Sequence, residues 1–472
     1  MNNSSESANT QSPRHKLWRF AALTGCISAA FAAAIVLREP SVSKAVVAPI
    51  LLNGEQTLAL IPSVAVTSAS GRALEKAQGK VREKTGDASR WVDLGDALAQ
   101  NLRETSDEKF YDHAETAYQY ALKLQPTAID ALTGMAWVHG GRHNFSQSRE
   151  WANRALAIDA DNAAALGILG DAALELGDYD AAYEHYQKMM DLKPDLSSWS
   201  RGAHLLHMTG ETSAAISLME KAIKAGGPFA ENTAWCRAKL AMMLFSQGAL
   251  LPAAQALERP LKAGSKNIHV LLAAGRVAAA REDFATAEQH YRAVIANAPN
   301  HDALVALGDI CAAKGDNEGA EVYYAQVEAL EAAQNARSGH SHIAMAKFFA
   351  DHDRKPIEAL RMAEPQKLTR NVSEADTLAW VYFKNGDQTR AIEAIKRALS
   401  QKTQEPEIHY HAGMIAAKFG DRASAQKHLQ QALNLNPRFN LLQAPLAVKA
   451  LEELGGINAP ATARLVKEGA AQ

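Results

Sequence analysis

The sequence predicts an all-α fold in which pairs of antiparallel helices stack on one another to form an alpha-alpha superhelix, or solenoid. The chain has 472 residues, which is too many for one compact core of ordinary size. Apolar residues make up 47% of the chain and Ala supplies much of that share, and Ala has the highest helix propensity of all residues. A pattern of small residues, turns and prolines also recurs along most of the chain, as it does in linear arrays of helix pairs.

The amino-terminal segments precede this array. Residues 1–16 are polar and rich in Ser and Asn, so we expect a disordered tail there. Residues 17–38 hold a long apolar run that follows several basic residues. A helix over Leu17–Leu37 comes close to the length that crosses a bilayer, and basic residues before such a helix favour a cytoplasmic amino terminus. We therefore expect a single-pass transmembrane anchor with the array on the extracytoplasmic side.

A cleaved signal peptide has the same layout of a basic start, an apolar middle and small residues afterwards. In this alternative, cleavage after Ser43-Lys44-Ala45 releases a periplasmic or secreted protein that begins near Val46. The sequence leaves both alternatives open, and in both of them the helical array is exported.

Residues 39–72 differ in composition from everything that follows. Val, Ile and Leu cluster on both sides of Asn53-Gly54, a dipeptide that is common in tight hairpin turns. Pro49 and Pro62 restrict this segment to the edge of any sheet. We expect a linker with a short hairpin or an extended conformation.

The repeat array is predicted over residues 73–435. Three stretches, Leu169–Pro194, Leu304–Leu330 and Tyr410–Pro437, share one skeleton. An early Gly is followed by a Gly-Asp turn and then by an Ala, and Pro closes two of the three stretches. Where two helices cross, a large side chain would hold them apart, and Gly at the turn supplies a left-handed helix cap without steric cost. The shared residues are Gly170, Gly308 and Gly413, then Gly177, Gly315 and Gly420, and then Ala182, Ala320 and Ala425.

This skeleton resembles the tetratricopeptide repeat, because several features recur together with a period of about 34 residues. Laid along the chain, it gives about nine to ten helix pairs. Residues 436–472 are predicted to form a capping helix and a tail. The predicted units begin near residues 88, 129, 163, 196, 234, 268, 301, 340, 372 and 406.

The resemblance implies that the first helix of each pair lines a concave groove, where partners of this family usually bind. The residues that the phase of each unit places there combine aromatic, Met and basic side chains, which is typical of protein-binding hot spots. The alternative for Trp235 and Trp380 is a place in the core. The groove set is Trp137, Asp171, Arg201, His204, Trp235, Lys239, Met242, Arg276, Trp380, Tyr410, His411 and Met414.

No motif for phosphate binding, metal-dependent hydrolysis or a serine nucleophile occurs in the sequence. We therefore expect no enzymatic activity, no cofactor and no metal. A net charge of −2 provides no global attraction for nucleic acid. The expected function is a membrane-tethered scaffold that binds a protein or peptide. One alternative is a soluble exported assembly factor, and another is a metal-binding or enzymatic protein that uses His204 and His207. The sequence leaves the partner and the oligomeric state open.

Overall fold

The computed structural model describes residues 52–455, apart from short gaps at 64–67, 106, 228–229, 297–298 and 339–342. The predicted tail and the predicted anchor Leu17–Leu37 lie outside the described residues. Within the described part, no helix is both long enough and apolar enough to cross a membrane.

The predicted all-α class is confirmed, because every regular element in the described residues is helical. Two helices, α1 (Gly54–Ala59) and α2 (Ala69–Glu83), pack at the amino-terminal end of the array. Antiparallel pairs then follow in order. The pairs of the first half are α3 (Ala88–Thr105) with α4 (Lys109–Leu124), α5 (Ile129–Gly141) with α6 (Phe145–Leu156), α7 (Ala163–Glu175) with α8 (Tyr179–Leu192), α9 (Leu196–Met208) with α10 (Thr212–Ala225), and α11 (Ala230–Ser246) with α12 (Leu250–Lys262).

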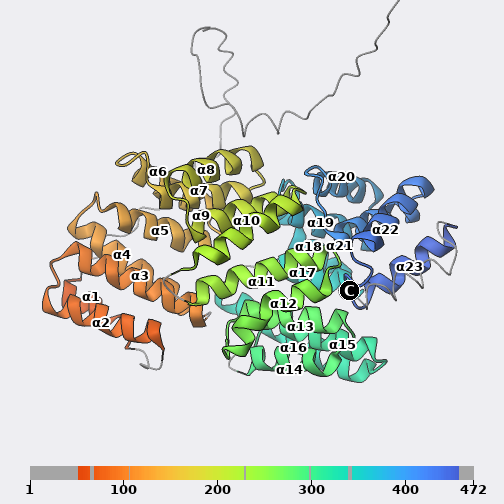
Figure 1. Ribbon diagram of the computed structural model, residues 1–472, viewed down its shortest axis with the longest axis horizontal. Helices are drawn as coiled ribbons and strands as arrows, with labels where there is room; N and C mark the ends of the chain where they lie inside the picture. The colour runs from red at the N-terminus through yellow and green to blue at the C-terminus, as the bar shows by residue number, and fades with distance from the viewer. Residues whose placement is uncertain are drawn as a thin grey trace, which may run out of the picture. The chain divides into compact units, whose positions relative to one another are not determined.

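The second half continues the same arrangement and ends in a single helix (Figure 1). A short 3-10 turn at Glu364–Gln366 follows α18. The helices are α13 (Ile268–Ala280) with α14 (Phe284–Ile295), α15 (His301–Ala313) with α16 (Asn317–Ser338), α17 (Ile343–Asp351) with α18 (Pro356–Ala363), α19 (Val372–Lys384) with α20 (Gln388–Ala398), α21 (Pro406–Lys418) with α22 (Arg422–Leu435), and α23 (Gln443–Glu453).

The first helices of most units begin at the residues where the repeat pattern places them, from α3 at Ala88 to α21 at Pro406. The units near 234 and 340 differ by a few residues, because α11 starts at Ala230 and α17 at Ile343. The array also begins before residue 73, since α2 starts at Ala69.

The segment around Asn53 is a correction to the predicted hairpin or extended linker. Asn53 caps α1, because its side chain accepts a hydrogen bond of 2.9 Å from the Gln56 backbone. The Gln56 side chain accepts one of 3.0 Å from the Asn53 backbone in return. This reciprocal capping box starts a helix, and it satisfies backbone donors that a two-residue hairpin turn would leave to a partner strand.

Small residues have the two roles that the sequence pattern indicates. A Cβ atom built on Gly170 in α7 would lie 2.3 Å from the Tyr186 ring of α8, so only Gly permits this helix crossing. Gly177, in the turn that joins the two helices, has a φ of +71°, a conformation that strongly favours Gly.

The later repeats fold back against the earlier ones. Asn371, which precedes α19, donates a hydrogen bond to the Glu175 carbonyl in α7. Glu405, which precedes α21, accepts a hydrogen bond from Ser246 at the end of α11. Asn436, which follows α22, donates to the Phe245 carbonyl at 2.8 Å. Successive turns of the first half therefore meet successive loops of the second half, as the neighbouring positions of α9–α11 and α19–α21 in Figure 1 show.

Candidate functional site

The folding back of the array forms a partly open cavity of about 430 Å³ on its inner side. The first helices α11, α13, α15 and α17 contribute to its lining, together with the amino-terminal turn of α21 and the loop before α23. Helices from both halves of the array therefore meet around one space, which carries a cationic wall and an acidic wall.

Lys239 and Arg276 form the cationic wall, on the neighbouring first helices α11 and α13. The Lys239 ammonium lies 5.3 Å from the centre of the Trp235 ring. The Arg276 guanidinium lies 4.9 Å from the centre of the Phe245 ring and donates a hydrogen bond of 3.4 Å to the Phe439 carbonyl. Neither side chain forms an ion pair with a carboxylate of the described residues, although the Arg276 charge helps to lower the pKa of Glu405 and of Glu407.

Burial adjusts the charges along this wall. It lowers the pKa of Lys239, and Glu175 only partly opposes the change. Burial also lowers the pKa of His204 to about 3, with a contribution from the Lys239 charge. The same two causes lower the pKa of His269. Near neutral pH, the imidazoles are therefore uncharged and Lys239 is the principal cation of this group, which favours a negatively charged ligand group beside it.

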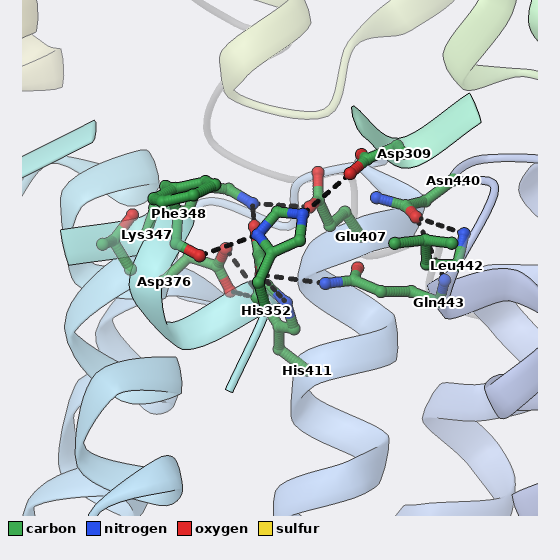
Figure 2. A network of polar contacts seen from close by, with 12 residues as sticks. Asp309, Lys347, Phe348, His352, Asp376, Glu407, His411, Asn440, Leu442 and Gln443 are labelled. Atoms are coloured by element: carbon green, nitrogen blue, oxygen red, sulfur yellow. Dashed lines mark hydrogen bonds and ion pairs between the residues drawn. The ribbon is translucent and has the colours of Figure 1, made fainter. Parts of the chain in front are cut away.

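The acidic wall centres on Lys347, whose ammonium lies 2.6 Å from an Asp351 carboxylate oxygen and 2.6 Å from a Glu407 carboxylate oxygen. Gln443 donates a hydrogen bond of 2.9 Å to Asp351. Burial is the largest single influence and raises the pKa of Glu407, but the nearby positive charges, with that of Lys347 first among them, and the Lys347 hydrogen bond together outweigh it, and the pKa falls to about 2. Figure 2 shows the Lys347 and Glu407 side chains converging in this cluster.

His411 lies next to this cluster and is fully buried. Its Nδ1 atom lies 2.9 Å and 3.0 Å from the two Asp376 carboxylate oxygens, so Nδ1–H donates to this carboxylate. Its ring stacks on Trp380 with 4.2 Å between the ring centres. The Nε2 atom lies 3.9 Å from an Asp351 carboxylate oxygen and has no hydrogen-bond partner among the described residues.

A second histidine, His352, differs from His411 because both of its ring nitrogens have partners. Nδ1 lies 2.8 Å from the Phe348 carbonyl oxygen and Nε2 lies 2.7 Å from an Asp309 carboxylate oxygen. Burial lowers the pKa of His352. The hydrogen bond and charge of the Asp309 carboxylate act in the opposite direction, and the pKa is raised overall. This ring serves as a donor at both ends.

The predicted groove residues differ in their surroundings: some line the cavity, two form an ion pair with each other, and others lie in the interior. Lys239, Met242 and Arg276 line the cavity. Asp171 and Arg201 are bound to each other, with an Nε–Oδ1 distance of 2.8 Å and an Nη2–Oδ2 distance of 3.0 Å. The half-buried side chains of the predicted set are Trp137, Asp171, Arg201, His204, Trp235, Lys239, Met242 and Met414.

Trp380, Tyr410 and His411 lie in the interior and not on an open groove face, with at most 2% of each residue exposed. Aromatic side chains of the second half cover these residues and explain the difference from the prediction. Phe439, in the loop before α23, covers the Tyr410 ring at 5.6 Å, and Phe383 covers Trp380 at 4.8 Å. The core alternative therefore describes Trp380, whereas Trp235 stays half-buried.

Sequence reasoning missed Lys347, Asp351 and Glu407. They lie in and after the unit near 340, where the repeat pattern is most degenerate. The spacing of Lys347 and Asp351 by four residues on one helix was a usable signal for an ion pair. The contribution of Glu407 depends on a contact between residues 60 positions apart, which no local pattern indicates.

His204 and His207, the histidines of the metal-binding alternative, are not part of the group of side chains that could hold a metal ion. His207 lies 2.6 Å from a Glu405 carboxylate oxygen instead. Among the described residues, Asp351, Glu407 and His411 bring one ligand atom each to within 4.8 Å of one another.

Comparison with known proteins identifies the repeat. Family models of the tetratricopeptide repeat match residues 133–197, 272–337, 376–404 and 406–439. The bifunctional subunit NrfFG of the formate-dependent nitrite reductase complex of Haemophilus influenzae is 29% identical over 121 residues, which are 25% of this chain and 30% of the relative. Subunit NrfG of the same complex in Escherichia coli is 30% identical over 123 residues, which are 25% of this chain and 58% of the relative. The chain therefore spans less than two thirds of either relative.

A solved structure of PilF from Pseudomonas aeruginosa is similar with a TM-score of 0.34 and 21% identity, and the match covers 46% of this chain and 90% of that one.

Proposed function

We propose that this chain, which belongs to the tetratricopeptide repeat family, is a non-catalytic scaffold that binds a segment of another protein along the inner face of α5, α7, α9, α11 and α13. Proteins of this family are interaction scaffolds, and the described array has the helix pairs that such a role requires. The proposed surface ends at the cavity between the two halves of the array.

The observation that carries the proposal is the pair of cations Lys239 and Arg276. Neither has an ion-pair partner in the described part of the chain, and both line the cavity, Lys239 as a half-buried side chain and Arg276 as an exposed one. A half-buried charge such as that of Lys239 is costly to leave without a counter-charge. An acidic side chain or a terminal carboxylate of the partner supplies that counter-charge. Trp235 and Met242 beside them supply apolar contact area, which is typical of the centre of a protein interface.

We further propose that Leu17–Leu37 tethers the array to a membrane and that the array lies on the extracytoplasmic side. The relatives NrfFG and NrfG are named as subunits of a multi-protein enzyme complex, which supports a partner that is itself part of a larger assembly. The alternative remains an exported assembly factor without the anchor. Intact-mass measurement of the protein from its native host separates a chain that keeps Leu17–Leu37 from one that begins near Val46.

Site-specific crosslinking tests the groove. A photoreactive amino acid at Met242, inside the cavity, should give a defined crosslinked partner band in the native host, whereas the same amino acid at exposed Lys221 of α10 should not. Lys239→Glu should weaken the Met242 crosslink at least about tenfold, since it places a like charge against an acidic ligand. Lys221→Glu makes the same charge change on an exposed helix face and should leave the crosslink unchanged. Equal loss from both variants, or no loss from either, would contradict the proposal.

A further inference from the structure

We propose that Asp351, Glu407 and His411 form a binding site for one divalent transition-metal ion of the Zn²⁺ type, and that the metal ion takes the place of the Lys347 ammonium. The inference goes beyond partner binding, because it concerns the acidic wall of the cavity and not the cationic one.

The two carboxylates already converge on a single cationic centre. Both carboxylate oxygens lie 2.6 Å from the Lys347 nitrogen, whereas oxygen and nitrogen ligands of Zn²⁺ lie at roughly 2.0–2.2 Å. Replacing the ammonium by a metal ion therefore requires each of the two carboxylate oxygens to move inward by about half an ångström. The three ligand atoms, including His411 Nε2, lie within 4.8 Å of one another. A doubly charged ion also neutralises Asp351 and Glu407 completely, while the single charge of Lys347 does not.

The free nitrogen of His411 is the independent observation that points to a metal ion. The His411 side chain is fully buried, and its Nε2 atom faces Asp351 without a hydrogen-bond partner among the described residues. Its Nδ1–H donates to Asp376. A carboxylate that holds Nδ1–H directs the Nε2 lone pair outward, which is the arrangement that orients histidine ligands in metal proteins. A buried nitrogen without a partner is costly, and coordination removes that cost.

A path to the site exists. Lys347, Asp351 and Glu407 all line the cavity of about 430 Å³, so an ion can reach the carboxylates from it. The displaced Lys347 side chain has a flexible four-carbon stem and can turn into the same space. A bound ion would join α17 and α21 directly and α19 through Asp376, so it would tie together three first helices of the second half.

The test is titration of the full-length protein with Zn²⁺, followed by calorimetry, and with Co²⁺, followed by visible absorption. We expect one ion per chain. His411→Gln, which removes the imidazole ligand, should weaken binding at least about tenfold, and Asp376→Asn should weaken it about 10- to 100-fold as a second-shell change. Lys347→Met, which removes the competing ammonium, should strengthen binding.

His352→Gln is the matched control, because His352 is also buried beside a carboxylate but has no free ring nitrogen. Binding in this variant should equal that of the wild type, and far-ultraviolet circular dichroism checks that each variant is folded. The proposal is overturned if the wild type binds no stoichiometric ion, including the case in which only Lys347→Met binds one. It is also overturned if folded His411→Gln and Asp376→Asn bind as tightly as the wild type.

Discussion

His207 and Glu405 are in contact, with 2.6 Å between His207 Nε2 and Glu405 Oε1, although one ends α9 and the other precedes α21. The Ser246 hydroxyl lies 3.0 Å from the second oxygen of the same carboxylate. One side chain of the second half is thus held by two helices of the first half. This contact is one of several that close the inner side of the array and create the cavity.

Removing the Glu405 charge should loosen this junction. Glu405→Gln replaces a charge-assisted contact by a weaker one, so we expect the free energy of unfolding to fall by about 1–2 kcal/mol. Hydrogen exchange should rise at both sides of the junction, around Ser246 and Glu405. The exposed Glu453 of α23 provides a control of the same chemistry, and Glu453→Gln should change neither measurement.

The effect should depend on pH in a defined direction. Burial raises the pKa of Glu405, but the hydrogen bond and charge of His207, the Ser246 hydrogen bond and the Arg276 charge together outweigh it and hold the pKa below its ordinary value of 4.5. A depressed pKa in the folded state stabilises the protein above the unfolded-state pKa, and this stabilisation is lost as the pH falls through the folded-state value. The stability difference between the wild type and Glu405→Gln should therefore shrink as the pH falls below about 4.5. A difference that grows on acidification would contradict this assignment.

The role of Gly170 can be tested against another helical glycine. A Cβ at Gly170 would lie 2.3 Å from the Tyr186 ring, whereas a Cβ at Gly79 of α2 would have no atom within 4 Å. Gly170→Ala should therefore cost about 1–3 kcal/mol through overpacking, and Gly170→Leu should cost more. Gly79→Ala should be neutral or stabilise the protein by up to about 1 kcal/mol, through helix propensity. Thermal unfolding of Gly170→Ala and Gly79→Ala tests this difference in stability. Equal melting temperatures would contradict the packing role of Gly170.

A recurring Tyr–Asp hydrogen bond offers another matched pair. The Tyr186 hydroxyl donates to Asp171 at 2.8 Å, and Tyr324 donates to Asp309 in the same way at 2.9 Å. In the unit of α13 and α14, Arg276 follows Gly275 at the place where the units that begin with α7 and α15 have Asp171 and Asp309, so Tyr291 lacks this acceptor. Tyr186→Phe should lower the unfolding free energy by about 0.5–1.5 kcal/mol, whereas Tyr291→Phe should change it by less than about 0.5 kcal/mol. Chemical denaturation measures both, and a larger cost at Tyr291 would refute this explanation.

Structural features that depend on residues within one repeat unit could be predicted from the sequence, whereas features that depend on several units could not. The helix pairs follow from local rules, because Gly170 and Gly177 report a crossing and a turn within one unit, and the period carries these rules along the chain. The capping box of Asn53 was also local, but the Asn-Gly dipeptide favoured a hairpin instead. The cavity and the burial of Tyr410 depend on how far the array curves, which is the sum of small rotations between units. No single residue encodes that sum.

The sequence predicted part of the candidate site, namely the helices on which its cationic residues lie. The phase of the repeat placed Lys239 and Arg276 correctly on first helices, and both line the cavity. The phase did not reveal that Phe439 would cover Tyr410 or that Lys347 and Glu407 would meet, because these pairs join different units. Predictions within a unit therefore agree with the structure better than predictions about the surface that several units build together.

Arg201 distinguishes structure from partner binding among the predicted groove residues. Its guanidinium holds both Asp171 oxygens, and Asp171 also accepts from Tyr186, so its charge is already compensated within the chain. Arg201→Lys cannot reproduce the two-point contact and should lower the unfolding free energy by about 1 kcal/mol or more. The crosslink from Met242 should nevertheless stay at the wild-type level, because no partner contact is removed.

Lys239→Glu should weaken the crosslink in a variant that is still folded, although the new carboxylate near Glu175 should also lower the melting temperature. Lys239 has no ion-pair partner among the described residues that the substitution would leave buried. If Arg201→Lys instead abolished the crosslink at a temperature where the variant is fully folded, Arg201 would belong to the binding surface. Arg201 would then have a binding role in addition to its ion pair with Asp171.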